Sequence, residues 1–509
     1  MQPFWKELFY TDVHFRDDWQ FEVEADFAPI TSSKESTTIQ EFYFYLPQGL
    51  QVDSESYLKE QFYVDRTNLI RFKTPEFSLQ ELCDHKNDRS PLYRIRHALH
   101  SATLDDEKET IDDELKLFAN VFRSSIRRNV RDFFKLVQKA KTPTEQQECS
   151  ERILSFCSDI KHLRKVLLDV KAEFFSIVSD KELRLVFSTV DEFCCGTIEH
   201  FLTGFLEYVR RFHIQNLNEI DTLLCEILLD VQMYIEKNFS VPHEVLEDPL
   251  RLNEYILFRR GQLNKFVLDA LLLNLRRTSL VQRYGGRLAT LAASLAMLIY
   301  VSIITLQVLH VEIGALTVIL ITVGLYTLKE QLKDWLKDIF HKQARVLFSD
   351  YTTEIRSPSG RRVLGKIKEF FSFLTPSRVP EDVSAAENAG EDLILPHLKV
   401  PKTIIYYKKE VVLQESDIEQ LGRRKTLHNI LLFNIFSFMK KASNPTEPSF
   451  VLDFNSFEIG RKDLPKVYHI DIILKTTTKI ADEEIGKELK KFRIVATKSG
   501  ILRIEEVHL

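Results

Sequence analysis

The 509-residue sequence lacks the motifs by which most catalytic and nucleotide-binding sites are identified. It contains no Walker A loop and no GxGxxG, GxSxG, HExxH or CxxC pattern. Glycine is scarce (15 residues) and phenylalanine abundant (37), which is typical of long helices with bulky packing rather than of a loop-rich enzyme. The formal net charge of -5 is small for this length, so a global basic surface for nucleic acid is excluded. We expect no cofactor.

Charge is absent from two adjacent apolar runs in the middle of the chain. Residues 288–309 form a run of 22, which as a helix spans about 33 Å, enough for the hydrocarbon core of a bilayer. Residues 313–328 form a second run of 16, spanning about 24 Å, and only three residues separate the two. We therefore predict a transmembrane helical hairpin at residues 286–328, in preference to a buried core hairpin of the same length.

Basic residues flank both ends of this predicted hairpin, and its turn contains none. The positive-inside rule then places both long arms and both termini in the cytoplasm, and no signal peptide contradicts this. We predict an integral membrane protein in contact with lipid, most simply in a bacterial cytoplasmic membrane. The predicted membrane-flanking residues are Arg276, Arg277, Arg283, Arg287, Lys329, Lys333 and Lys337. Small residues predicted to pack the two helices together, or to form a homo-oligomeric seam, are Ala289, Ala292, Ala293, Ser294 and Ala296.

The cysteines show no ligand or disulfide pattern. All lie in the part of the chain before the hairpin, which is predicted to be cytoplasmic and where thiols stay reduced. The vicinal pair Cys194 and Cys195 falls in an apolar helical stretch, so structural packing is favoured over a redox sensor. The six are Cys83, Cys149, Cys157, Cys194, Cys195 and Cys225.

Hydrophobic periodicity changes along the N-terminal half. Residues 19–27 alternate strictly between apolar and polar, which predicts a half-buried strand, and residues 39–46 and 69–72 predict two more within a β-rich region at 1–100. Apolar residues then recur every three or four positions through four segments before Pro242. Residues 101–285 therefore predict a helical bundle ending in a basic juxtamembrane helix, with a long coiled coil as the alternative.

Past the hairpin, juxtamembrane helices are predicted at 329–375, a linker at 376–401 and a C-terminal α/β domain at 402–509. Residues 361–374 predict a basic amphipathic helix that lies on anionic lipid or packs on the bundle. In the last domain, strands are predicted at 403–413, 467–475, 492–497 and 501–507, and a helix at 418–439. Gly500 is expected to adopt a positive φ in a hairpin. The two β-rich ends are further conjectured to form one domain.

Candidate catalytic residues are few. The weak candidates are His469, Asp471 and Lys475 on one predicted strand: Asp471 and Lys475 form a loose nuclease-like set with Asp453 and Glu458, or His469 and Asp471 form the polar floor of a binding pocket. A solvated strand face is the simpler interpretation of all five. His97 and His100 are three residues apart, but a zinc site needs further ligands, so we predict no metal site.

Three functions are compatible with these features. The favoured one is a membrane-anchored interaction, scaffold or sensor protein without a catalytic site, binding a protein partner or a second copy of itself. The alternatives are an oligomeric pore-forming effector that uses the hairpin, and a membrane-tethered enzyme with its site in the C-terminal domain. The fold class predicted with all three is a mixed α+β membrane protein.

Overall fold

The computed structural model describes residues 13–27, 35–84, 86–100, 107–139, 142–211, 217–239, 245, 248–279, 349–358, 362–389, 401–414, 426–452, 459–480 and 483–507, with scattered positions between 290 and 335. Within these residues the chain is a mixture of helix and sheet. It divides into two compact units. Unit 1 contains Met1–Asp12, Ile70–Leu273 and Leu421–Asn429, and unit 2 contains Val13–Leu69, Asn274–Gln420 and Ile430–Leu509.

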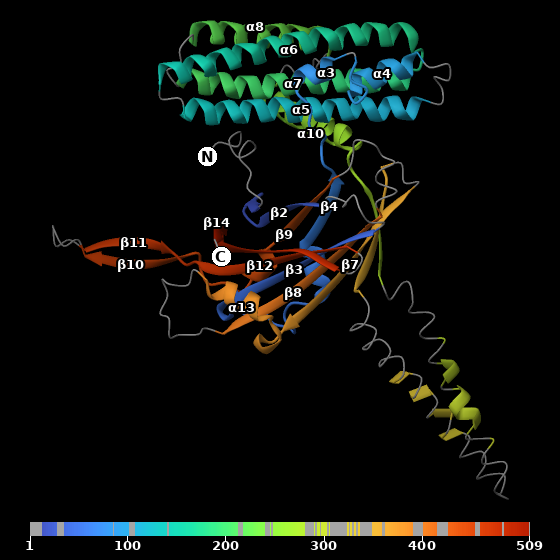
Figure 1. Cartoon of the computed structure of the whole chain (residues 1–509). Helices are drawn as coiled ribbons and strands as arrows, with labels where there is room; N and C mark the ends of the chain where they lie inside the picture. Colours follow the sequence, from blue (N-terminus) through green and yellow to red (C-terminus); the bar gives the residue numbers. More distant parts are fainter. Residues whose placement is uncertain are drawn as a thin grey trace, which may run out of the picture. The chain divides into compact units, whose positions relative to one another are not determined.

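Unit 1 is built on four long helices that lie side by side (Figure 1). Their apolar stripes face inward, as shown by the full burial of Ile111, Leu115 and Phe118 in α5. Long helices therefore occupy much of the region 101–285, in which a bundle is predicted. The long helices are α5 (Lys108–Lys139), α6 (Pro143–Ile177), α7 (Lys181–Arg211) and α8 (Leu217–Asn238), and α3 (Leu79–Cys83), α4 (Pro91–Leu99) and α10 (Pro249–Leu268) accompany them.

The start of α6 follows directly from its sequence. The Thr142 hydroxyl accepts a hydrogen bond from the Glu145 backbone N–H at 3.3 Å, and the Glu145 carboxylate accepts one from the Thr142 backbone N–H at 3.0 Å. This reciprocal capping box satisfies two N–H groups that the first turn leaves unpaired. Pro143 occupies the first helical turn, where its missing N–H costs nothing.

A buried ion cluster ties three of the bundle helices together. The Asp191 carboxylate of α7 is fully buried and accepts hydrogen bonds from Arg164 (2.6 Å) and Lys171 (2.7 Å) of α6 and from the Tyr234 hydroxyl (2.6 Å) of α8. Burial alone would raise the pKa of Asp191, but Arg164, Lys171 and Tyr234 together hold it below the usual value. Cys194 and Cys195 lie beside this cluster, and both are fully buried.

Unit 2 contains an eight-stranded antiparallel sheet in the order β14-β13-β12-β3-β8-β7-β6-β5. Strand β3 lies inside the sheet and pairs with β12 on one side and β8 on the other, so the conjecture that the two β-rich ends form one domain is confirmed. The strands are β3 (Glu35–Pro47), β5 (Asn274–Ser279), β6 (Tyr351–Arg356), β7 (Val363–Leu374), β8 (Lys402–Gln414), β12 (Tyr468–Ile480), β13 (Glu483–Thr497) and β14 (Gly500–Val507).

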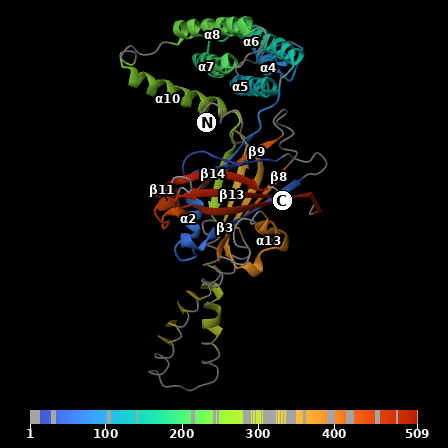
Figure 2. The same ribbon diagram turned by 90° about the vertical axis from the view of Figure 1, so that its left-hand side faces the viewer.

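The two faces of this sheet are covered differently. On one face Phe42 and Phe44 pack with Phe433, and with Phe62 of α2 (Lys59–Asp65), in the main core. On the other face α13 (Glu381–Asn388) packs Val383 and its neighbours against a smaller cluster. Figure 2 shows α2 and α13 on two sides of the sheet.

A second sheet, in the order β1-β2-β9-β4, contributes to the main core. Strands β4 and β9 each contain residues of both units. Its strands are β1 (Val13–Phe15), β2 (Gln20–Phe27), β4 (Arg66–Phe72) and β9 (Leu427–Asn434). The remaining elements are η1 (Gln48–Leu50), η2 (Pro376–Arg378), α15 (Phe436–Met439) and a separate hairpin of β10 (Thr446–Leu452) and β11 (Ile459–Pro465).

The prediction of a membrane protein is contradicted. In the part of the chain that the structure describes, no helix combines the length and the apolar character needed to cross a bilayer. The described positions of the predicted hairpin form only short helical stretches, such as 297–302. The transmembrane hairpin, the membrane localisation and the membrane part of the fold class are therefore wrong on this evidence. A mixed helix-and-sheet fold remains.

The residues predicted to serve that hairpin are only partly described. Ala293 and Ser294 lie in a short helical stretch, whereas Arg276 and Arg277 belong to the edge strand β5, not to a helix. The Arg277 guanidinium lies over the Tyr351 ring, 3.6 Å from its centroid. Ala289, Ala292, Ala296, Arg283, Arg287, Lys329, Lys333 and Lys337 lie outside the described residues.

Two predicted helices are strands. The segment predicted as an amphipathic helix at 361–374 contains β7, and the one predicted at 418–439 contains β9 followed by the short α15. Similarly, the helix expected through 250–287 ends with α10 at Leu268 and gives way to β5. In contrast, the strands predicted in the C-terminal domain are confirmed as β8, β12, β13 and β14.

Candidate functional site

The predicted catalytic residues lie together on the face of the eight-stranded sheet that carries α13. Asp471 lies between His469 and Lys475 on β12. It is buried and accepts hydrogen bonds from Arg493 Nε at 2.8 Å and Nη2 at 3.4 Å. Arg493 is its register partner on β13, and Lys402 Nζ lies 3.7 Å away. Two cations therefore pair with this carboxylate.

Lys475 likewise forms an ion pair with a neighbouring residue of the fold. Its Nζ lies 3.0 Å from the Asp382 carboxylate of α13, and Lys487 Nζ lies 2.6 Å from the same group. The hydrogen bond from Lys487, with that from Lys475, lowers the pKa of Asp382 to about 2. These ion pairs attach the first turn of α13 to β12 and β13, where acidic residues also favour the helix dipole.

His469 is half-buried on the same strand face. Burial lowers its pKa below the usual value, and the positive charge of Arg493 adds to this effect. The imidazole is therefore neutral at neutral pH. The structure brings His469, Asp471 and Lys475 to one face, but it engages the charged ones in ion pairs with structural partners. Their catalytic role stays a prediction.

The other two acidic residues of the nuclease-like set, Asp453 and Glu458, lie outside the described residues. His97 and His100 lie at the end of α4, where His100 Nε2 is 2.9 Å from Glu173.

Sequence reasoning missed a buried polar cluster between the two sheets of unit 2. Arg66 of β4 makes a two-pronged ion pair with Glu369 of β7, with one contact at 3.1 Å, and its Nη1 also donates to the Tyr407 hydroxyl at 2.7 Å. The Tyr407 hydroxyl donates to Glu369 at 2.6 Å, and the Asn68 amide does so at 3.0 Å. Burial raises the pKa of Tyr407 well above its usual value.

Lys409 extends this cluster along the sheet. It is fully buried, and it is the register partner of Glu369 on one side and of Gln40 on the other. Burial lowers the pKa of Lys409 to about 7, although Glu369 acts in the opposite direction. The Gln40 side chain is also buried, and neither its amide nitrogen nor its amide oxygen has a hydrogen-bond partner.

A neutral lysine amine is a potential nucleophile, but it needs a route for a substrate. Lys409 has no exposed surface, so the structure offers no such route. The cluster therefore belongs to the core between the sheets, where its ion pair joins β4 to β7.

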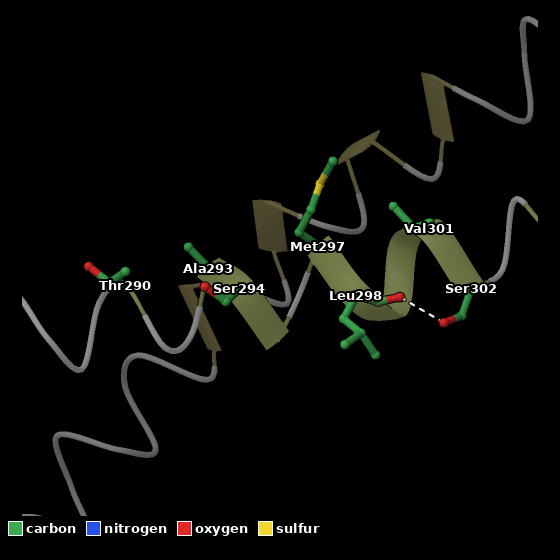
Figure 3. Close-up of a pocket in the computed structure, with 7 residues that line it drawn as sticks. All are labelled: Thr290, Ala293, Ser294, Met297, Leu298, Val301 and Ser302. Atoms are coloured by element: carbon green, nitrogen blue, oxygen red, sulfur yellow. Dashed lines mark hydrogen bonds between the residues drawn. The ribbon is translucent and has the colours of Figure 1, made fainter.

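The surface hollow in Figure 3 does not enclose a ligand. Its lining residues all come from positions between 290 and 302, and they project in different directions instead of converging on a common point. The Ser302 hydroxyl donates to the Leu298 carbonyl of the same stretch at 2.8 Å. The hollow is lined by Thr290, Ala293, Ser294, Met297, Leu298, Val301 and Ser302.

A more unusual surface is the separate two-stranded hairpin of β10 and β11, here called the arm, which extends away from the eight-stranded sheet (Figure 1). Every residue of β11 is exposed. Phe450, Leu452 and Ile459 are 74%, 41% and 72% exposed. Isolated two-stranded hairpins are marginally stable in water, because neither face is covered.

The register of the arm gathers these apolar side chains on one face. Leu452 lies opposite Ile459, Phe450 opposite Arg461, and Pro448 opposite Asp463. Directly opposed residues of an antiparallel pair project to the same side, and alternate residues along a strand do so too. The arm face therefore consists of Pro448, Phe450, Leu452, Ile459, Arg461 and Asp463.

No family model, curated protein or solved structure matches this chain. The function has to be inferred from its own residues. Among the described surfaces, the arm face places three exposed apolar side chains on one side of a paired hairpin, and the buried clusters show no access for a substrate.

Proposed function

We propose that the protein is a non-catalytic interaction or scaffold protein that self-associates through its arm face. The observation that supports this most strongly is the uncovered β10–β11 hairpin, whose three exposed apolar side chains share one face. Exposed apolar patches with a polar rim are typical of protein interfaces. The pairing of Asp471 with Arg493 and Lys402 argues against the competing enzyme hypothesis.

A second copy of the chain is the partner that fits this face best. Stacking two arms face to face covers the apolar residues of both, so each arm supplies the layer that the other lacks. The arm face also carries one cation, Arg461, and one anion, Asp463, so it has no net charge to oppose self-association. Across a two-fold axis, Arg461 of one copy can pair with Asp463 of the other.

The expected affinity is moderate. Burying an exposed large apolar side chain contributes about 2 kcal/mol, so the six of two arms contribute roughly 12 kcal/mol. Association costs at least about 4 kcal/mol in lost translational and rotational freedom. The net stabilisation is then at most about 8 kcal/mol, which corresponds to a dissociation constant on the order of 1 µM or weaker.

Light scattering on the full chain over a range of concentrations tests this proposal. The wild type should shift from monomer to dimer as its concentration rises, whereas a Phe450→Ser, Ile459→Ser variant should stay monomeric. These side chains are exposed, so circular dichroism should show an unchanged fold. Leu185→Ser is the matched control, because Leu185 is 68% exposed on α7 of unit 1, and this variant should associate like the wild type.

Two results would contradict the proposal. A wild type that stays monomeric well above micromolar concentration lacks the association altogether. A double variant that still dimerises like the wild type shows that another surface is responsible.

A further inference from the structure

Strands β1 and β2 place an imidazole and two carboxylates on one face. His14 of β1 is the register partner of Glu22 of β2, so the two side chains project to the same side of the hairpin. Glu24 follows Glu22 by two residues, so it shares that side as well. Val13 and Val23 point the opposite way, into the main core. The pairing of the strands therefore fixes all three polar side chains next to each other.

The donor atoms of these residues are close enough to bind one ion. One ligand atom from each of His14, Glu22 and Glu24 can be chosen so that all three lie within 4.8 Å of one another. His14 Nε2 lies 3.7 Å from Glu22 Oε2. Two ligands that are each about 2.0–2.1 Å from a tetrahedral zinc ion lie about 3.3 Å apart, so only a small side-chain adjustment is needed.

The surroundings of the three groups favour a bound cation. The side chains of His14 and Glu22 are only 17% and 12% exposed. In a half-buried setting, two carboxylates attract a divalent cation more strongly than they do in open water. The site therefore has both the donor atoms and the electrostatic reason for an ion.

We propose that His14, Glu22 and Glu24 bind one divalent transition-metal ion, with Zn²⁺ as the preferred ion and water in the remaining position. One imidazole nitrogen and two carboxylate oxygens form a mixed donor set that suits Zn²⁺, whereas Ca²⁺ needs six to eight oxygen ligands. Three protein ligands leave a coordination position open. This site is independent of the arm face and of the proposed self-association.

Calorimetric titration of the full chain with Zn²⁺ tests the site. The wild type should bind one equivalent that is lost, or weakened at least about tenfold, in His14→Ala and in Glu24→Gln. His97→Ala is the matched control, since it removes a histidine that lies outside the proposed site. It should keep the wild-type titration. An equivalent that survives in both variants, or no Zn²⁺ binding by the wild type, overturns the proposal.

Two further measurements keep the test decisive. Thermal unfolding in EDTA should show the variants as stable as the wild type, and added Zn²⁺ should raise the midpoint only for the wild type and His97→Ala. Cobalt(II) bound to the wild type should show a ligand-field spectrum without thiolate charge-transfer bands. Thiolate bands would assign the ion to cysteines instead and overturn the proposal.

Discussion

Three polar residues, Gln40, Glu369 and Lys409, occupy inward positions of neighbouring strands, and Glu369 and Lys409 each interrupt an otherwise apolar alternation. In β8 the inward residues run Ile405, Tyr407, Lys409, Val411 and Leu413. Gln40 and Glu369 occupy the same level of β3 and β7, because both are register partners of Lys409. The sequence alone predicts β8 as a strand, at 403–413. The alignment of the three polar positions into one row depends on register between distant segments, which one sequence does not reveal.

Lys409 should make the stability of the protein depend on pH. Its pKa is about 7 in the folded chain and about 10.4 in the unfolded chain. Below pH 7 the amine is protonated in both states, and the full cost of the buried charge is present. Between pH 7 and about pH 10.4 the unfolded state binds the proton that the folded state has released, so the free energy of unfolding rises with pH.

Replacing this amine tests the assignment. Lys409→Met keeps the side-chain volume and removes the charge, so it should raise the free energy of unfolding at pH 7, on the order of 1–4 kcal/mol, and flatten the rise up to pH 10. Urea unfolding followed by circular dichroism at several pH values measures both effects. Lys408→Met, on the opposite face of the same strand, should keep the wild-type slope. A destabilised Lys409→Met variant at pH 7 would show that Glu369 needs the charged lysine.

At the scale of single elements, the sequence predicts strands well where apolar and polar residues alternate along the chain. The strict alternation at 19–27 becomes β2, and the alternation around Ile470 and Ile472 becomes β12. Strands with apolar residues on both faces are mistaken for helices. In β7, Phe371 and Phe373 pack with the main core while Leu374 packs with the cluster under α13. Such a strand has apolar residues at consecutive positions in the sequence. This pattern is also compatible with the spacing of apolar residues in a helix.

The β13–β14 hairpin provides an element-scale prediction. Gly500 has a φ of +138°, and a Cβ built there would lie 2.6 Å from the Asp18 carbonyl oxygen. Gly500→Ala should therefore lower the free energy of unfolding by about 1–3 kcal/mol, through both the backbone strain and the clash. Gly486→Ala, in the part of β13 that pairs with β12, is the control because a Cβ there contacts nothing within 4 Å, so it should be neutral or slightly stabilising. Equal effects of the two changes in urea unfolding would rule out this explanation.

At the scale of the whole molecule, all six cysteines are free, and five of them are buried. Burial raises the pKa of Cys83 to about 11 and the pKa values of Cys157 and Cys195 to about 12, and it also raises those of Cys149 and Cys194. Thiolates are the reactive form, so the vicinal pair is poorly suited to redox sensing. This agrees with the packing role that the sequence favours for it.

Thiol titration with a disulfide reagent at pH 8 should therefore show one rapidly reacting thiol in the folded protein and six in urea. The rapid thiol should be the half-buried Cys225, and Cys225→Ser should remove it. Rapid reaction of two or more thiols in the folded protein would show that the core opens, or that the vicinal pair is reactive after all.

The interior position of β3 has a consequence for how the chain is made. Its partners β8 and β12 are encoded more than 350 residues after it begins, while the bundle helices α5 to α8 lie between them in the sequence. On a ribosome the bundle is complete long before β3 can pair. Until then, β3 remains an unpaired segment that exposes Phe42 and Phe44. Such segments aggregate or require a chaperone. Pairing of β3 is thus late relative to completion of the bundle, although this strand precedes the bundle in the sequence.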